Sequence, residues 1–178
     1  MNENGRNSVN HARSTWRSCR SSIRADIQAN AGDPKSIALL SLFRLTQMAM
    51  GNLGHPRKIS YPLVMLYRIV SELLFGVELR PKTRVGDGLT IFHGYGLVVN
   101  NSAVIGRNVT LRNGVTIGSR RNGGACPVLE DGVEVGAGAV ILGGIVIGSG
   151  SKIGAGSVVL NSVPSGSVAV GNPARLIK

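Results

Sequence analysis

The chain has 178 residues, a length that allows one domain, or one domain with a small appendage. Hydrophobic residues make up 43% of it but aromatic residues only 4%, which indicates a core built from aliphatic side chains. The formal net charge of +11 is concentrated in residues 1–84, which carry 13 Lys and Arg against 5 Asp and Glu. No nucleic-acid-binding motif and no interleaved aromatic residues accompany this charge, so we exclude nucleic acid as a partner.

The cysteine content and the first 30 residues indicate the cellular compartment. Cys19 and Cys126 are too few for a disulfide framework and are compatible with a reducing cytoplasm. The first 30 residues contain five arginines and no apolar stretch of the kind found in a signal peptide. We therefore expect a cytoplasmic protein.

Residues 1–76 are predicted to form a basic, α-helical N-terminal region, of which 1–20 are expected to be disordered. A short helix is expected over 22–30. Asp33-Pro34 marks the start of the next helix, and apolar residues at helical spacing extend it over 35–50. A further apolar helix is expected over 62–75. Neither of the two longer helices has the ~18 uninterrupted apolar residues that span a bilayer. They are expected to pack on each other and on the next domain, with peripheral membrane contact as the alternative.

From residue 77 to 178 the sequence follows a six-residue period, which fits neither an α-helix nor a simple alternating strand. Hexapeptide repetition is typical of a parallel β-helix, in which three short strands and three tight turns make one coil. The fourth residue after each aliphatic position is also apolar or small. The aliphatic positions of the period are Val99, Ile105, Leu111, Ile117, Leu129, Val135, Ile141, Ile147, Ile153 and Val159.

The six-residue period is interrupted at two places. Residues 119–127 replace part of the repeat with polar, glycine-rich sequence, which predicts a loop thrown out from one corner. An early frame of aliphatic residues shifts by two positions beside His93-Gly94-Tyr95-Gly96. Such an irregularity is a candidate location for an active site.

His93 is the only one of three histidines that lies within the repeat. Histidine is well suited to take a proton from a hydroxyl group at neutral pH. A plain surface histidine in a turn is the alternative. A three-histidine zinc site needs ligands that this chain lacks, so no metal is expected.

The segments Phe75–Pro81, Ile91–Val99, Gly114–Gly118 and Gly171–Arg175 resemble the hexapeptide acyltransferases of the serine O-acetyltransferase type. The resemblance covers about residues 22–178 and is greatest to the colanic-acid-type exopolysaccharide acetyltransferases, which share the His-Gly-Tyr stretch and the Ala-Cys-Pro of the loop. It implies a left-handed β-helix, a homotrimer, and active sites between neighbouring prisms.

The resemblance also implies a mechanism. His93 matches the general base that deprotonates the acceptor hydroxyl, which then attacks the thioester of acetyl-CoA directly, with no acyl-enzyme. Glu78 occupies the place of the acidic residue that orients this histidine. Backbone N–H groups near the glycine-rich turns would hold the oxyanion.

Small residues at the coil edges are the expected contacts for acetyl-CoA. The pantetheine arm is placed along Gly118, Ala137 and Ala155, where missing side chains let backbone amides approach. Arg175 and Lys178 are candidates for the CoA phosphates, although both also fit a solvated tail.

Departures from the serine acetyltransferase pattern bear on the acceptor. The aspartate that precedes the base is replaced by Phe92, and the Arg-His pair of the loop by Ala125-Cys126. Each lost charge-assisted hydrogen bond weakens serine binding by roughly 1.5–3 kcal/mol. A sugar hydroxyl suits the ring faces of Phe92 and Tyr95 better. Nothing in the sequence marks Cys126 as an activated nucleophile.

The sequence therefore predicts an acetyl-CoA-dependent O-acetyltransferase that modifies a sugar or lipid-linked sugar of an exopolysaccharide precursor. Its basic N-terminal region would suit a lipid-linked acceptor at the inner face of the membrane. Two alternatives remain: a serine O-acetyltransferase, and a non-catalytic solenoid scaffold.

Overall fold

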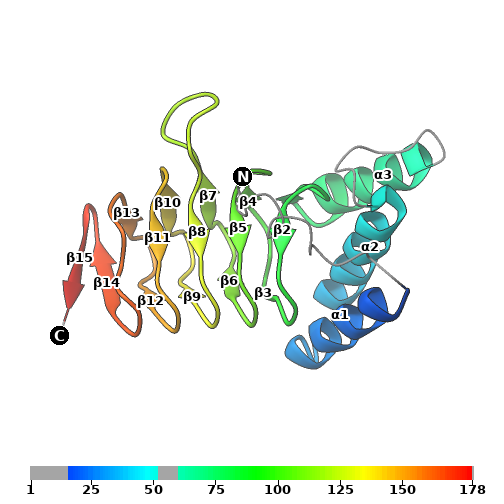
Figure 1. Ribbon diagram of the computed structural model, residues 1–178, viewed down its shortest axis with the longest axis horizontal. Helices are drawn as coiled ribbons and strands as arrows, with labels where there is room; N and C mark the ends of the chain where they lie inside the picture. The colour runs from blue at the N-terminus through cyan, green and yellow to red at the C-terminus, as the bar shows by residue number, and fades with distance from the viewer. Residues whose placement is uncertain (1–15, 52–59, 178) are drawn as a thin grey trace, which may run out of the picture.

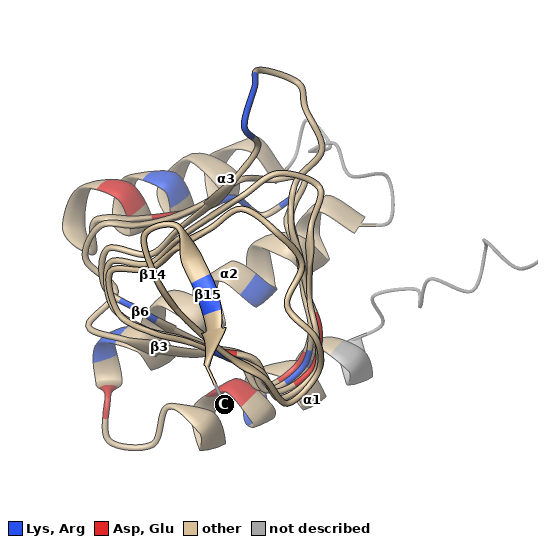
Figure 2. Ribbon diagram, turned by 90° about the vertical axis from the view of Figure 1, so that its left-hand side faces the viewer, with Lys and Arg blue, Asp and Glu red and all other residues tan. Residues whose placement is uncertain are grey.

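The computed structural model describes residues 16–51 and 60–177. Most of it is a left-handed parallel β-helix of about five coils, as the sequence predicts, with helices packed at one end (Figure 1). Viewed along the solenoid axis, the coils superimpose and the loop after β7 projects away from them (Figure 2). No helix in the described part of the chain is long and apolar enough to cross a membrane.

Successive coils contribute strands in turn to three sheets, whose strands pair in parallel from coil to coil. Sheet A contains β1 (Val77–Leu79), β4 (Leu97–Val99), β7 (Thr116–Gly118), β10 (Val140–Leu142) and β13 (Val158–Val159). Sheet B contains β2 (Arg84–Val85), β5 (Val104–Ile105), β8 (Val128–Leu129) and β11 (Val146–Ile147). Sheet C contains β3 (Thr90–Phe92), β6 (Thr110–Arg112), β9 (Glu134–Val135), β12 (Lys152–Ile153), β14 (Val168–Gly171) and β15 (Ala174–Ile177), the last pair antiparallel.

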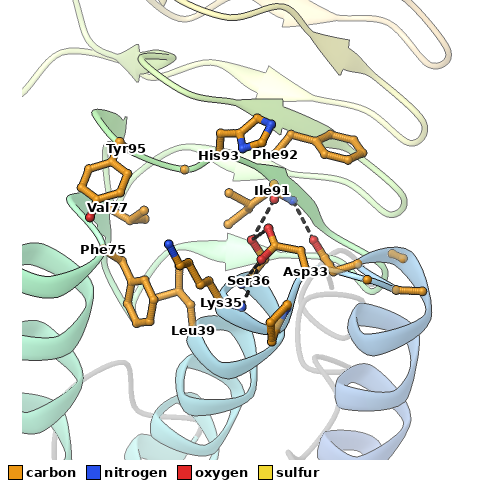
Figure 3. A pocket seen from close by; sticks show the side chains of 16 residues that line it. Asp33, Lys35, Ser36, Leu39, Phe75, Val77, Ile91, Phe92, His93 and Tyr95 are labelled. Atoms are coloured by element: carbon orange, nitrogen blue, oxygen red, sulfur yellow. Dashed lines mark hydrogen bonds between the residues drawn. The ribbon is translucent and has the colours of Figure 1, made fainter.

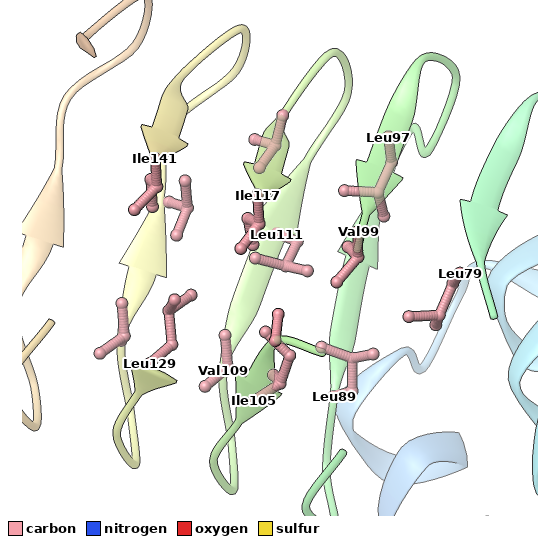
Figure 4. Packing of buried hydrophobic residues seen from close by; sticks show 14 of the residues in the cluster. Leu79, Leu89, Leu97, Val99, Ile105, Val109, Leu111, Ile117, Leu129 and Ile141 are labelled. Atoms are coloured by element: carbon pink, nitrogen blue, oxygen red, sulfur yellow. The ribbon is translucent and has the colours of Figure 1, made fainter. Parts of the chain in front are cut away.

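The core of the solenoid is a stack of aliphatic side chains (Figure 4). All ten positions of the predicted six-residue period are buried, none more than 3% exposed. Partners in adjacent coils lie directly over one another, as Ile117 does between Val99 and Ile141. Each such side chain contributes about 1.5–3 kcal/mol through burial. The period predicted from the sequence is thus the physical basis of the fold.

The N-terminal region consists of α1 (Trp16–Ala29), α2 (Pro34–Met50) and α3 (Tyr61–Arg68), which continues as a π-helix, η4 (Ile69–Leu74). Helix α1 begins six residues before the expected start at 22, so the prediction that 1–20 are disordered is wrong for residues 16–20. Cys19 explains this, because it is buried against α2 with its thiol 3.7 Å from the Arg44 carbonyl oxygen. Residues 1–15 lie outside the described part.

Side chains of the helices close the open end of the solenoid. The first strand of each sheet has an edge with no neighbouring strand, and such edges expose unpaired backbone groups. The Tyr67 hydroxyl donates to the carbonyl of Leu79 on β1, and the Arg44 guanidinium donates to the carbonyls of Val85 and Gly86 beside β2. Arg44 also forms a buried ion pair with Asp26, 2.8 Å long.

The loop predicted over 119–127 is present between β7 and β8. Arg120 anchors it, since its guanidinium donates to the carbonyl oxygens of Leu142 and Leu160 on two further coils. Gly143 permits this contact, because a Cβ there would lie 2.9 Å from Nε of Arg120. The loop is therefore fastened to the body of the solenoid near its base.

Candidate active site

His93 lies in the turn between β3 and β4, at a corner of the solenoid. Ile91 and Val99, which both point into the core, are eight residues apart here instead of six, so this turn contains two extra residues. They account for the shift of frame seen in the sequence. The φ angle of His93 is 54°, a left-handed conformation that non-glycine residues rarely adopt. The two extra residues thus place a histidine in the turn at a corner that is otherwise regular.

His93 borders a hollow of about 690 Å³ between this turn and the start of α2, here called the His93 hollow (Figure 3). Apolar side chains and two charged ones line it together with the imidazole. Its principal side chains are those of Asp33, Lys35, Leu39, Phe75, Val77, Ile91, Phe92, His93 and Tyr95. The helical region and the solenoid therefore build this hollow jointly.

Asp33 is the N-cap of α2, and its carboxylate is held in place by three donors. Oδ1 accepts from the backbone N–H groups of Lys35 (3.0 Å) and Ser36 (3.3 Å), and Oδ2 accepts from the Ser36 hydroxyl (2.9 Å). Burial alone would raise the pKa of this carboxyl. The Ser36 and Lys35 hydrogen bonds and the charge of His93 outweigh burial and lower the pKa below its ordinary value. Asp33 therefore supplies a fixed negative charge beside His93.

Lys35 extends from the first turn of α2 into the same hollow (Figure 3). Among the described residues, no carboxylate oxygen forms an ion pair with its ammonium nitrogen at 4.0 Å or less. The His93 hollow thus contains one anionic and one cationic side chain. The replacements at Phe92, Ala125 and Cys126 therefore do not leave the His93 hollow without a pair of opposite charges.

Sequence reasoning identified Asp33 only as a helix cap and did not single out Lys35. The signal in the sequence, Asp-Pro before an apolar helix, indicates where a helix starts but not which part of the solenoid the helix meets. The contact between the start of α2 and the end of β3 is a tertiary one, so no local pattern predicts it.

The two aromatic residues predicted to bind substrate both line the His93 hollow. Phe92 is 41% exposed, and the Arg112 guanidinium lies 5.1 Å from its ring centre. Tyr95 is 63% exposed, and its hydroxyl donates to the Leu74 carbonyl oxygen at 3.2 Å. Exposed ring faces beside an imidazole can pack on the C–H surface of a ligand.

Glu78 is located elsewhere in the single chain. It lines a second hollow, of about 390 Å³ on sheet A, which also includes Gly118. Its carboxylate accepts from Nη2 of Arg80 at 2.9 Å, and Arg80 also reaches Glu72 at 3.7 Å. The chain therefore does not bring Glu78 and His93 into the same hollow.

Ala137 and Ala155 lie on the corner that carries His93. Backbone hydrogen bonds connect this corner from coil to coil, from Gly114 to the Tyr95 carbonyl and from Gly156 to the Ala137 carbonyl, each 2.8 Å long. At Gly114, φ is 67°, a conformation that favours glycine, and the glycines Gly96, Gly114 and Gly138 lie above one another at this corner. Gly118 ends β7 and does not belong to this corner.

The remaining predicted residues lie apart from the His93 hollow. Arg175 is exposed on β15, and Lys178 lies outside the described residues. Cys126 is half-buried at the base of the loop, with its thiol 3.9 Å from the Gly124 carbonyl. Among residues 16–51 and 60–177, no group of three His, Cys, Asp or Glu side chains is arranged to hold a metal ion.

The chain is similar to known transferases of the hexapeptide-repeat type. Residues 126–161 match the family model described as bacterial transferase hexapeptide (six repeats). WcaB of Escherichia coli K12, named as a colanic acid biosynthesis acetyltransferase, is 47% identical over 116 residues, which cover 65% of this chain and 72% of that protein. Serine acetyltransferase 4 of Arabidopsis thaliana is 39% identical over 173 residues, covering 90% of this chain and 48% of that protein.

Solved structures of serine acetyltransferases are also similar. The soybean apoenzyme has a TM-score of 0.78 at 37% identity, covering 90% of this chain and 69% of that one. A serine acetyltransferase in complex with CoA has a TM-score of 0.76 at 32% identity, covering 91% of this chain and 71% of that one. The similarity includes the helices as well as the solenoid, because it extends over nine tenths of the chain.

Proposed function

Because the chain belongs to the hexapeptide-repeat acetyltransferases, we propose that it transfers an acetyl group from acetyl-CoA to a sugar hydroxyl of an exopolysaccharide precursor. That the chain is an acyltransferase enzyme follows from its family. The sugar acceptor is supported by the similarity to WcaB and by one structural observation. That observation is the His93 hollow, in which the partly exposed rings of Phe92 and Tyr95 flank the imidazole.

His93 acts in this proposal as the general base. Its imidazole takes the proton of the acceptor hydroxyl while the oxygen attacks the thioester carbonyl. The new C–O bond forms, the tetrahedral intermediate collapses with loss of the C–S bond, and the proton passes to the departing CoA thiolate. Backbone N–H groups of the nearby glycine-rich turns stabilise the oxyanion. No acyl-enzyme forms.

A carboxylate near His93 stabilises the imidazolium that arises in this step. Asp33 is suited to this role, since it shares the hollow and its low pKa keeps it ionised. Glu78 remains the residue predicted to orient His93. Since the single chain keeps Glu78 and His93 in separate hollows, Glu78 has this role only if a neighbouring chain brings its carboxylate to the imidazole.

Acetyl-CoA is proposed to lie along the corner of Ala137 and Ala155, which is continuous with the turn of His93. Arg175 and Lys178 are proposed to meet its phosphates. Gly118 takes part only if a second chain brings its sheet A to this corner. That arrangement agrees with a homotrimer whose active sites lie between neighbouring prisms.

The outer face of sheet B offers a further apolar surface for subunit contact, in addition to sheet A. Val104, Val128 and Val146 are partners on adjacent strands and form an outward column, of which Val146 is 41% exposed. Apolar columns on a solenoid surface are typical of subunit contacts. We therefore include the homotrimer in the proposal.

The proposal also includes a cytoplasmic location with peripheral contact at the inner face of the membrane. Helix α3 and η4 support it, since Met65, Leu66, Ile69, Leu73 and Leu74 are each about half exposed or more. Sedimentation of the full chain with anionic liposomes at low salt tests this contact, with Leu73→Glu as the comparison. Failure of the wild-type chain to sediment removes the membrane contact and leaves the chemistry untouched.

Serine O-acetylation is the second candidate, and the structure favours it through Asp33 and Lys35. A zwitterion such as serine needs one partner of each charge, and both occur in the His93 hollow. The test is CoA release from acetyl-CoA with L-serine and with a panel of nucleotide- and lipid-linked sugars. Turnover of a sugar but not of serine supports the proposal, and the reverse result establishes the second candidate.

A further inference from the structure

The strand that leads to His93 is the outermost strand of its sheet, and side chains of the helices bind its free edge. β3 ends the order of sheet C, so the backbone groups of Leu89 and Ile91 on that side have no strand to pair with. Asp26 Oδ1 accepts from the Leu89 N–H at 3.1 Å, and Asn30 Nδ2 donates to the Leu89 carbonyl at 2.8 Å. The helices thus replace the missing coil.

Ile91, two residues before His93, is held on both sides of its backbone. Asn30 Oδ1 accepts from its N–H at 3.0 Å, and the Ser36 hydroxyl donates to its carbonyl oxygen at 2.8 Å. Asn30 is 4% exposed and Ser36 5% exposed, so water does not compete for these bonds. Buried hydrogen bonds of this kind are costly to break.

The Ser36 hydroxyl also reaches Asp33. It lies 2.9 Å from Oδ2 of Asp33, so its single proton is shared between that carboxylate and the Ile91 carbonyl. One hydroxyl therefore joins the strand before His93 to the anionic group of the same hollow. Ser36 is in position to fix how the imidazole and the carboxylate lie relative to each other.

The conformation of His93 makes this support necessary. A left-handed φ of 54° is unfavourable for a residue with a Cβ, and it persists only where the surrounding structure enforces it. The turn after His93 is held by backbone hydrogen bonds, among them one from the Gly96 N–H to the Gly76 carbonyl at 2.8 Å, and Ile91 before it is fixed by two buried side chains. On the strand side of His93, the enforcing contacts are therefore those of Asn30 and Ser36.

We infer that Asn30 and Ser36 are positioning residues of the transfer reaction, which hold β3 so that His93 faces the acceptor in reactive geometry. The inference rests on the proposed role of His93 as base. It assigns to the N-terminal helices a part in catalysis that does not require them to touch the substrate.

Ser36→Ala tests this inference, with Ser151→Ala as the matched control. Ser151 is also fully buried, and its hydroxyl donates to the Pro164 carbonyl at 2.7 Å, far along the solenoid from His93. We expect Ser36→Ala to lower kcat by about 10- to 100-fold with an unchanged KM for acetyl-CoA, since small displacements of a base cost this much. Both variants are expected to lower Tm by similar amounts, with kcat unchanged in the control.

A double-mutant cycle separates positioning from a structural role. In the His93→Ala background, Ser36→Ala is expected to cause no further loss of residual activity, because its effect acts through the imidazole. If the two losses multiply, the inference is overturned. Asn30→Ser, which withdraws the side chain from Ile91, serves the same cycle if Ser36→Ala does not fold.

A second readout needs no acceptor, so it stays valid if the sugar proposal fails. The imidazole resonances of His93 are assigned by NMR through their absence in His93→Ala. They are expected to shift or broaden in Ser36→Ala and to stay unchanged in Ser151→Ala. Unchanged resonances in both variants contradict the inference irrespective of the acceptor.

Discussion

The Asp33 carboxylate and the His93 imidazole face one hollow, although the first belongs to the start of a helix and the second to a turn of the solenoid. Burial acts to raise the pKa of Asp33, but the hydrogen bonds that cap the helix lower it below its ordinary value, and the charge of His93 adds to this lowering. The helical region thus takes part in the site as well as closing the end of the β-helix.

Asp33→Ala is expected to lower the free energy of unfolding by about 1 kcal/mol at pH 7, the usual value of an N-cap. The folded-state pKa of Asp33 lies below the ordinary value of about 3.9, so its stabilising contribution is complete above about pH 4. It is lost as the pH falls through the folded-state pKa. Urea unfolding of the wild type and Asp33→Ala at pH 7 and pH 3 measures the difference in their free energies of unfolding, which is expected to be smaller at pH 3.

Asp33→Asn is the control, because it keeps an oxygen acceptor for the cap and removes the charge. The difference in free energy of unfolding between Asp33→Asn and Asp33→Ala is expected to be the same at pH 7 and at pH 3. A stability difference between the wild type and Asp33→Ala that widens at low pH contradicts the assigned role.

Removal of the Arg44 guanidinium is expected to destabilise the fold strongly. Arg44→Met leaves the buried Asp26 carboxylate without its partner and two carbonyls beside β2 without donors. Loss of one member of a buried pair costs about 3–5 kcal/mol. Arg68→Met, which breaks a half-exposed pair with Glu72, is expected to cost less than about 1 kcal/mol. Urea unfolding measures both losses of unfolding free energy. Equal losses in the two variants would contradict the larger contribution assigned to the buried pair.

Lys35→Met distinguishes the two candidate acceptors. Loss of a charge-assisted contact to the serine carboxylate corresponds to about a 10- to 150-fold rise in KM for L-serine. A neutral sugar hydroxyl does not require the ammonium group, so we expect its KM to change by less than about threefold. Steady-state kinetics with both acceptors make the comparison. A large rise in KM for the neutral sugar argues against the binding mode proposed here.

Val146→Glu is expected to convert the proposed homotrimer to monomers, since it places a charge at the outward valine column of sheet B. Thr110→Lys adds a charge to sheet C beside its strand partner Glu134 and is expected to leave the assembly intact. Analytical ultracentrifugation measures the mass of each variant. A trimer that survives Val146→Glu shows that sheet B is not the contact.

The solenoid could be predicted from the sequence because its determinant is local and periodic. Buried aliphatic positions recur every six residues except at the turn of His93 and across the loop at 119–127, which is a plain break in this pattern. The start of α1 lies six residues before the predicted one. The burial of Cys19 beside Arg44 comes from a contact with another helix and leaves no local pattern.

The candidate site was predictable only in its solenoid part. His93 is indicated by an irregularity of the repeat, and Phe92 and Tyr95 by comparison with the serine acetyltransferase pattern; the structure brings all three to one hollow. Asp33 and Lys35 were missed because they reach His93 through the packing of α2 on β3. The separation of Glu78 from His93 depends on which way each strand faces around the prism, which sequence spacing does not reveal.

The first measurement to make is CoA release from acetyl-CoA by the wild type and His93→Ala, with sugar acceptors and with L-serine. We predict turnover on a sugar that falls by about 10²- to 10⁴-fold in His93→Ala, the range for loss of a general base. Equal turnover in the two proteins would contradict the role of His93. Histidine-dependent turnover on L-serine alone would contradict the sugar acceptor.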